Sequence, residues 1–224
     1  MRENKKIINS IKKNLGIYIN NIYEFNNILN NNCIICGEFI LSHINNIYKY
    51  NTINHNMDII DIYCTNYEYN KLKLFLINNN FIINENMDIS IKNSKYLFNN
   101  IILKHEYKKK INNNNLTINI TITNNPIDYI NKYKKLNIEK NYYNGVLLII
   151  LYPKNVILKK DTLYINNLDI LYNTNIIKYL SYGYKIKLID MNNLNIINIY
   201  NFNKYKLKNN IKNYIDYIKY KIKL

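Results

Sequence analysis

Hydrophobic residues recur with two different periods along the chain, and the period separates predicted helices from predicted strands. Spacing of three to four predicts helices over Arg2–Lys13 and Tyr18–Leu29, with a break near Gly16, and over Asn66–Asn79. Strict alternation of polar and β-branched residues over Leu116–Thr123 predicts a strand with one polar face. This mixture predicts an α+β fold.

One stretch in the first third of the chain combines both periods. A short apolar run, Cys33–Cys36, stops at Gly37, and helical spacing follows over Phe39–Tyr48. A second apolar run, Ile59–Cys64, carries a single acid, Asp61. The stretch therefore predicts a strand, a glycine turn, a helix, a loop and a second strand with a carboxylate in it.

The residues of this stretch predict a ligand site. Gly37 lets backbone N–H groups approach a ligand at a helix N-terminus, where the helix dipole favours phosphate. A carboxylate such as Asp61 is costly on an apolar strand unless it binds a metal or a hydrogen-bond donor. Together, Gly37 and Asp61 predict a site for a metal-bound nucleotide.

Beyond these elements the pattern is less regular. Pro126 predicts the start of a short helix that continues through Tyr133. Two short apolar runs predict strands over Val146–Leu151 and Val156–Leu158.

The order of strand, glycine, helix and aspartate-bearing strand resembles the nucleotidyltransferase superfamily, which has the polymerase-beta-like fold. Ile118–Gly145 and Asn173–Ile186 resemble degraded forms of segments common to nucleotidyltransferase-like proteins of large DNA viruses. The resemblance implies a nucleotidyltransferase-like domain over 32–190, a mixed sheet that includes a strand over Leu136–Ile138 and is flanked by helices. It puts Gly37 and Glu38 at the nucleotide and Asp61 and Asp58 at the metal. A helical N-terminal extension over 1–31 and a lysine-rich C-terminal helix over 191–224 would flank this domain.

The resemblance implies phosphoryl transfer assisted by Mg²⁺, which two or three carboxylates on strands hold. Acids at positions i and i+2 of a strand point the same way. Asp58 and Asp61 are three residues apart, so Asp58 joins Asp61 only from a loop or a bulge. If the strand ends at Cys64, Ile60 stands at the position of the family's first aspartate.

Two further departures from the family pattern weaken the predicted site. Glu38 replaces the second small residue of the glycine motif, which puts a carboxylate where triphosphate oxygens belong. The family's third acidic position falls on Lys135 and Asn137, and an ammonium there would exclude a metal. We therefore expect a degraded metal site in a non-catalytic homologue that acts by binding a nucleotide, RNA or a protein. The alternatives are an active metal-dependent nucleotidyltransferase that uses Asp58 and Asp61, and a basic nucleic-acid-binding protein.

Charge alone does not decide between these hypotheses. The chain has 224 residues and a formal net charge of +16, which is typical of proteins with polyanionic partners. However, Asn, Ile, Lys and Tyr dominate, as A/T-rich codons favour, and the single arginine is Arg2. Codon drift raises the lysine content whether or not nucleic acid is bound. The lysine-rich end, Lys204–Leu224, fits an RNA-binding or membrane-surface segment as well as the solvated face of a packing helix.

The three cysteines lie in apolar runs. Their odd number and setting predict buried thiols in a reducing compartment, the cytoplasm of an infected host cell if the viral resemblance holds. The alternative is a zinc site in which His43 and His55 join Cys33, Cys36 and Cys64. No apolar run approaches the ~18 residues of a membrane span, so we expect no transmembrane segment.

Overall fold

The computed structural model describes residues 2–47, 58–84, 101–111, 114–134, 136–165, 179, 184–190 and 196–199. The chain divides into two compact units. The first contains residues 1–134 and 139–151, and the second contains residues 135–138 and 152–224.

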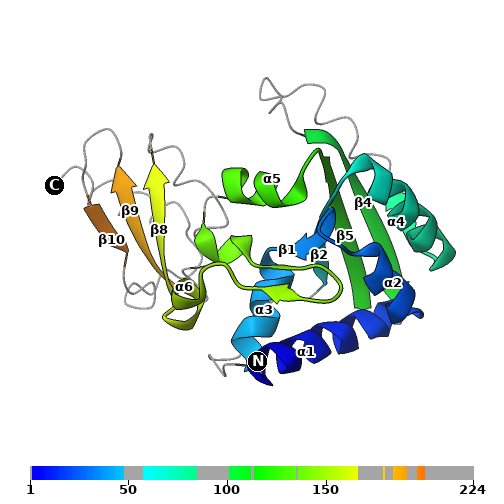
Figure 1. Cartoon of the computed structure of the whole chain (residues 1–224), viewed down its shortest axis with the longest axis horizontal. Helices are drawn as coiled ribbons and strands as arrows, with labels where there is room; N and C mark the ends of the chain where they lie inside the picture. Colours follow the sequence, from blue (N-terminus) through cyan, green and yellow to red (C-terminus); the bar gives the residue numbers. More distant parts are fainter. Residues whose placement is uncertain are drawn as a thin grey trace. The chain divides into compact units, whose positions relative to one another are not determined.

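The first unit is built on a mixed sheet of seven strands in the order β3-β4-β5-β2-β1-β6-β7 (Figure 1). The strands are β1 (Cys33–Cys36), β2 (Ile59–Cys64), β3 (Ile82–Asn84), β4 (Ile101–Ile111), β5 (Asn114–Thr123), β6 (Tyr142–Tyr143) and β7 (Leu148–Ile149). β2 and β5 are parallel, and the other neighbours are antiparallel. The strands predicted over Cys33–Cys36, Ile59–Cys64 and Leu116–Thr123 are confirmed as β1, β2 and β5, and so is the α+β class.

Five helices belong to this unit: α1 (Arg2–Tyr18), α2 (Ile22–Ile28), α3 (Glu38–Ile47), α4 (Asn66–Asn78) and α5 (Pro126–Tyr133). The helices predicted from Asn66 and from Pro126 are confirmed. The predicted break near Gly16 is wrong, because α1 continues through it to Tyr18. A glycine inside a helix costs only about 1 kcal/mol, and burial of Leu15 and Tyr18 on either side of Gly16 outweighs that cost.

One face of the sheet is apolar and lies under helices; we call it the covered face. Its central residues, Ile60, Ile62, Ile118 and Ile120, are all buried. Helix α1 reaches it at the Tyr18 carbonyl, which accepts a 2.6 Å hydrogen bond from Lys109 Nζ on β4. Helix α4 reaches it through a 3.1 Å hydrogen bond between the hydroxyls of Tyr69 and Tyr107. The core of the unit lies here.

The opposite face carries polar side chains; we call it the polar face. One row of neighbouring residues crosses five strands: Cys36, Asp61, Asn119, Glu106 and Asn84. Helix α5 covers the β1 end of this face, where Ile130 packs in an apolar cluster with Ile34, Cys36, Tyr63 and Tyr142. The polar residues of β2, β5 and β4 lie beyond that cluster.

Two predicted strands are wrong. Leu136–Ile138 is not a strand, and a short 3₁₀ helix spans Asn137–Lys140. Val156–Leu158 falls instead at the end of helix α6 (Pro153–Ile157). Pro153 occupies the first turn of α6, where its missing N–H is not needed and its fixed φ suits a helix. Of the predicted strand Val146–Leu151, only Leu148–Ile149 forms β7.

The second unit contains α6 and a sheet of three strands in the order β10-β9-β8. These are β8 (Lys160–Ile165), β9 (Lys185–Asp190) and β10 (Ile196–Ile199), with β8 and β9 parallel. Ile196–Ile199 was predicted as part of a helix over 191–224. It is a strand, because its β-branched isoleucines favour extended pairing with β9. The rest of that predicted helix, Lys204–Leu224 included, lies outside the described residues.

Among the residues described, none of the helices combines the length and the apolar character needed to cross a membrane.

Candidate ligand site on the polar face

Asp61 lies at the centre of the polar face. It is on β2, between β1 and β5, and its Oδ1 accepts a 3.1 Å hydrogen bond from Asn119 Nδ2. Gly37 ends the neighbouring strand with a φ of +81°, and a Cβ atom on it would lie 3.1 Å from Asp61 Oδ2. The structure therefore brings Gly37 and Asp61 together. The glycine is needed both for the left-handed backbone and for the close approach of the carboxylate.

Glu38 follows directly as the first residue of α3. A carboxylate in the first turn of a helix interacts favourably with the helix dipole. Glu38 thus has a stabilising role that the sequence prediction did not consider. Its predicted role beside a nucleotide remains a prediction.

Asp58 does not join Asp61. It precedes β2, where its carbonyl accepts a 2.7 Å hydrogen bond from the Thr117 amide, and pairing with β5 continues without a bulge. Burial raises the pKa of Tyr18, and the charge of Asp58 raises it further. Asp58 has the strand phase of Ile60, so its side chain does not share a side with Asp61.

The phase of β2 also determines on which side Ile60 lies. Ile60, predicted to stand at that position, is only 1% exposed and points toward the covered face. Alternation makes Ile59 and Tyr63 the strand neighbours that share a side with Asp61. Asp61 is therefore the single carboxylate that β2 contributes to the polar face.

A cation lines the same cavity as this carboxylate. Lys134 caps the C-terminus of α5, and its Nζ lies 5.4 Å from the centroid of the Tyr63 ring. Burial favours the neutral amine, but interactions with Tyr63, Cys36, Glu139 and Asp61 outweigh it and raise the pKa of Lys134 well above its ordinary value. Lys134 is thus a protonated ammonium in the environment of Asp61.

The predicted third acidic position falls on Lys135 and Asn137. Lys135 lies outside the described residues, and Asn137 belongs to the second unit. On the strand next to Asp61, the facing residue is Asn119. Sequence reasoning missed both Asn119 and Lys134. The signal for Asn119 was present, because strict alternation over β5 puts Thr117, Asn119 and Thr121 on the polar face.

A cavity of about 340 Å³ opens on this face. Its lining residues are Asp61, Tyr63, Lys104, His105, Glu106, Asn119, Ile120, Thr121 and Lys134. Hydrogen bonds from Lys108 and Asn84 hold the pKa of Glu106 below its usual value, so Glu106 is ionised. The cavity therefore offers two carboxylates, two ammonium groups, and amide and hydroxyl groups, which suits a polar ligand that carries charge.

The described residues contain no group of three or more His, Cys, Asp and Glu side chains that could hold a metal ion. Cys33 and Cys36 face opposite sides of β1, and Cys33 pairs with Cys64 instead. All three cysteines are free and buried, which confirms the predicted core thiols. Burial raises the pKa of Cys36 to about 12, so this thiol is protonated.

His43, one of the histidines of the zinc hypothesis, has other partners. It lies between α1 and α3, with Nδ1 2.9 Å from Ser10 Oγ and Nε2 3.3 Å from Asn14 Nδ2. It is fully buried, and burial lowers its pKa to about 4. His43 is a neutral structural residue of the helix packing. His55 lies outside the described residues.

Protein families, curated proteins and solved structures were each compared with this chain, and none of them matches it. The functional argument rests on the geometry above.

Proposed function

We propose that this chain is a nucleotidyltransferase-like protein that binds a nucleotide without a divalent metal and does not transfer it. The observation that carries the proposal is a cavity in which Asp61, the one β2 carboxylate on this face, shares the lining with Lys134 and Lys104. The Lys134 ammonium supplies the positive charge that bound metal ions supply in an active site of this class.

The topology supports the proposal. A strand ends in a glycine with positive φ, a helix follows, and the next strand, antiparallel to the first, carries Asp61. The third strand of the set, β5, lies parallel beside it. This is the order that the resemblance to the superfamily implies.

Electrostatics argues against a metal at this position. Mg²⁺ needs near-octahedral oxygen coordination and is held in such sites by more than one carboxylate or by a carboxylate with substrate phosphates. Here Asp61 accepts a hydrogen bond from an amide, Asn119, and shares the cavity with a cation, Lys134. Repulsion between an ammonium and a divalent cation in a partly buried site adds to the loss of ligands.

The same arrangement suits an anion. Lysine binds phosphate as a point charge and does not require a metal bridge. Lys104 lines the cavity with Lys134, and Asn119 and Thr121 offer amide and hydroxyl groups for hydrogen bonds. The two ammonium groups support a nucleotide as the ligand class, because they offer phosphate contacts in a cavity that also contains the carboxylates of Asp61 and Glu106.

The hypothesis of an active enzyme that uses Asp58 and Asp61 has no support in this geometry, because the two acids lie on opposite faces of the sheet. The test is calorimetric titration of each nucleoside triphosphate into the protein in EDTA and in Mg²⁺. We expect the same affinity for the preferred nucleotide in both buffers.

The matched variants are Lys134→Gln and Lys132→Gln, the latter an exposed lysine on the same helix. Loss of a charged phosphate contact costs about 1.5–3 kcal/mol, so Lys134→Gln should weaken binding at least tenfold and Lys132→Gln less than twofold. Binding that requires Mg²⁺, or equal effects of the two variants, would contradict the proposal.

A further inference from the structure

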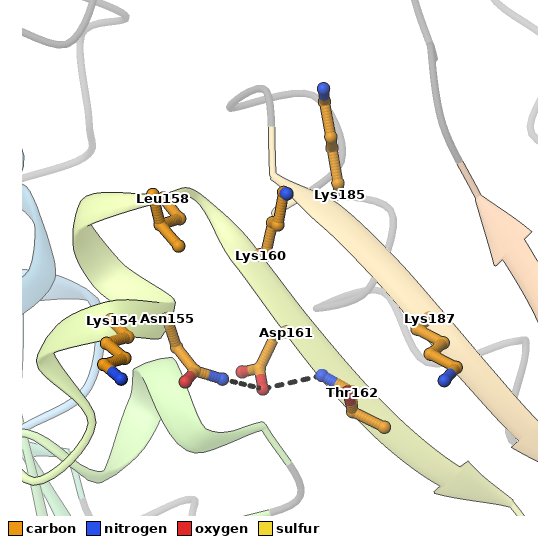
Figure 2. A pocket seen from close by; sticks show the side chains of 8 residues that line it. All are labelled: Lys154, Asn155, Leu158, Lys160, Asp161, Thr162, Lys185 and Lys187. Carbon is orange, nitrogen blue, oxygen red and sulfur yellow. Dashed lines mark hydrogen bonds between the residues drawn. The ribbon is translucent and has the colours of Figure 1, made fainter.

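The second unit contains a pocket of about 290 Å³ that is rich in lysine (Figure 2). Its lining residues are Lys154, Asn155, Leu158, Lys160, Asp161, Thr162, Lys185 and Lys187. Lys154 and Asn155 come from α6, and the others lie at the end of α6 or on β8 and β9. No part of the site described above contributes to this pocket.

The strand register gathers the lysines. In the parallel pair of β8 and β9, Lys160 is the direct neighbour of Lys185, and Thr162 is the neighbour of Lys187. Side chains two residues apart on a strand share a face, so these three lysines lie on one face of the pair. Like charges directly opposite each other destabilise a strand pair. The arrangement therefore costs stability unless an anion offsets it.

The buried acid of the pocket is not the counter-charge. Asp161 is only 3% exposed, and its Oδ1 accepts hydrogen bonds from Asn155 Nδ2 at 2.9 Å and from the Thr162 amide at 2.8 Å. Its Oδ2 accepts a 2.9 Å hydrogen bond from the Ile138 amide. All three donors are neutral groups, so the carboxylate of Asp161 is hydrogen-bonded without a lysine. Figure 2 shows the hydrogen bonds from Asn155 and Thr162.

In the part of the chain that the structure describes, none of these four lysines forms an ion pair. Lys154, Lys160 and Lys185 are exposed, and Lys187 is partly buried. The pocket thus presents four ammonium groups to solvent.

Codon drift does not account for this placement. Drift explains why the chain has many lysines, but it predicts lysines that are scattered over the surface. Here the pairing register aligns Lys160 with Lys185 across two strands, and α6 adds Lys154.

We propose that this pocket binds an anion with several phosphate groups. The phosphate chain of a nucleotide and the backbone of single-stranded RNA share this chemistry. One phosphate would not neutralise four ammonium groups, whereas two or three adjacent phosphates would. A lysine binds phosphate as a hydrated point charge and does not read bases, so the pocket should select phosphate density over base identity. Its volume lies at the lower end of ligand sites, which suits a small charged group.

The test uses the full chain with two probes, inorganic tripolyphosphate and a 12-mer oligouridylate, each titrated at several salt concentrations. The double variant Lys160→Gln/Lys185→Gln is compared with Lys6→Gln/Lys13→Gln, which removes the same charge from exposed positions on α1. We expect the pocket variant to weaken binding of at least one probe tenfold or more, and the control variant to weaken it less than twofold.

The two probes distinguish the sources of phosphate. If the site takes an RNA backbone, tripolyphosphate competes with the oligonucleotide, and the pocket variant lowers the salt slope for the oligonucleotide by about 1.4, about 0.7 for each lysine removed. If it takes the phosphate chain of a nucleotide, tripolyphosphate binds and the oligonucleotide does not compete.

Thermal unfolding without ligand provides a folding control. The pocket variant should be at least as stable as the wild type, because it relieves the repulsion between two opposed lysines. Equal weakening by both double variants would mean that only overall charge matters, and it would overturn the proposal. Absence of binding by both probes would overturn it as well.

Discussion

The same strands build both faces of the seven-stranded sheet, yet the two faces differ in almost every property. On the covered face, Ile60, Ile62 and Ile118 are at most 1% exposed and lie under helices. On the polar face, Asp61 and Asn119, their neighbours in sequence, hydrogen-bond to each other beside a cavity. Because side chains alternate between the two faces of a strand, one residue packs in the core and the next faces the cavity.

Polar groups have different roles on the two sides. His43, on the covered side, is buried with two hydrogen-bond partners and is neutral. Lys134 and Asp61, on the polar side, keep their charges around a cavity. A buried polar group with satisfied hydrogen bonds specifies packing, whereas charges that face a cavity are available to a ligand.

The largest expected effect comes from removing volume on the covered face. Ile118→Ala should lower the free energy of unfolding by about 2–5 kcal/mol, because it leaves a cavity in a closely packed core. Thr117→Ala, one residue away on the polar face, should change it by about 0.5 kcal/mol or less. Denaturant unfolding of both variants measures the difference. Similar losses would show that the two faces are not distinguished by packing.

The next effect concerns His43 and pH. Burial lowers its pKa from 6.5 to about 4, so the unfolded chain binds a proton between these values and the folded protein does not. The free energy of unfolding should therefore fall as the pH falls from about 6.5 to about 4, by on the order of 3 kcal/mol from this group.

Urea unfolding as a function of pH, compared between the wild type and His43→Gln, isolates the contribution of His43. The variant lacks the titrating group and should show a flatter profile over that range. Identical profiles would mean that His43 is accessible to protons in the folded state.

Replacement of Gly37 and of Gly16 by alanine should change the free energy of unfolding in opposite directions. Gly37→Ala places a side chain at positive φ and 3.1 Å from Asp61 Oδ2, so it should destabilise by about 1–2 kcal/mol. Gly16→Ala, inside α1 with 3.7 Å of room, should stabilise by up to about 1 kcal/mol. Thermal unfolding of the pair checks the signs. Stabilisation by Gly37→Ala would contradict the close contact with the carboxylate.

A smaller, more specific effect tests whether the cavity at Asp61 excludes a metal. Asn119 Nδ2 lies 3.1 Å from Asp61 Oδ1, so Asn119→Asp would set two carboxylates within reach of one cation. The double variant Asn119→Asp/Lys134→Gln should bind Mn²⁺ measurably. The paramagnetic signal of the free ion is used to measure this binding. The wild type and Asn119→Asp alone, which keeps the ammonium, should bind less. Mn²⁺ binding by the wild type would contradict the exclusion of a metal by Lys134.

The periodicity of the sequence predicted much of the fold. The runs at Cys33–Cys36 and Leu116–Thr123 and the proline at 126 carry local signals that packing reinforces. The prediction for Val156–Leu158 was wrong because its short apolar run favours a strand, whereas Pro153 begins a helix three residues earlier. The long strand β4 was not predicted, since its alternation is broken by charged residues that face a cavity or reach a helix, as Lys109 does.

The candidate site was predicted only in part. Gly37 and Asp61 are adjacent because a strand, a turn and a second strand follow one another, and this order can be predicted from the sequence. The separation of Asp58 from Asp61 follows from the phase of the strand. The sequence predicted this separation unless Asp58 lay in a loop or a bulge. The position of Lys134 depends on how α5 packs on the polar face through Ile130 and Tyr63. This packing cannot be predicted from a local sequence pattern.

The central claim is that Lys134 and the single carboxylate Asp61 leave a binding site without catalysis. The most direct measurement is incubation of the protein with each labelled nucleoside triphosphate, Mg²⁺ or Mn²⁺, and RNA, protein or small-alcohol acceptors. The account predicts no transfer above the level of the Asp61→Asn variant, because catalysis of this kind depends on preorganised charge around the reacting phosphate. Turnover that Asp61→Asn abolishes would contradict it, and would mean that another acid reaches a metal beside Asp61.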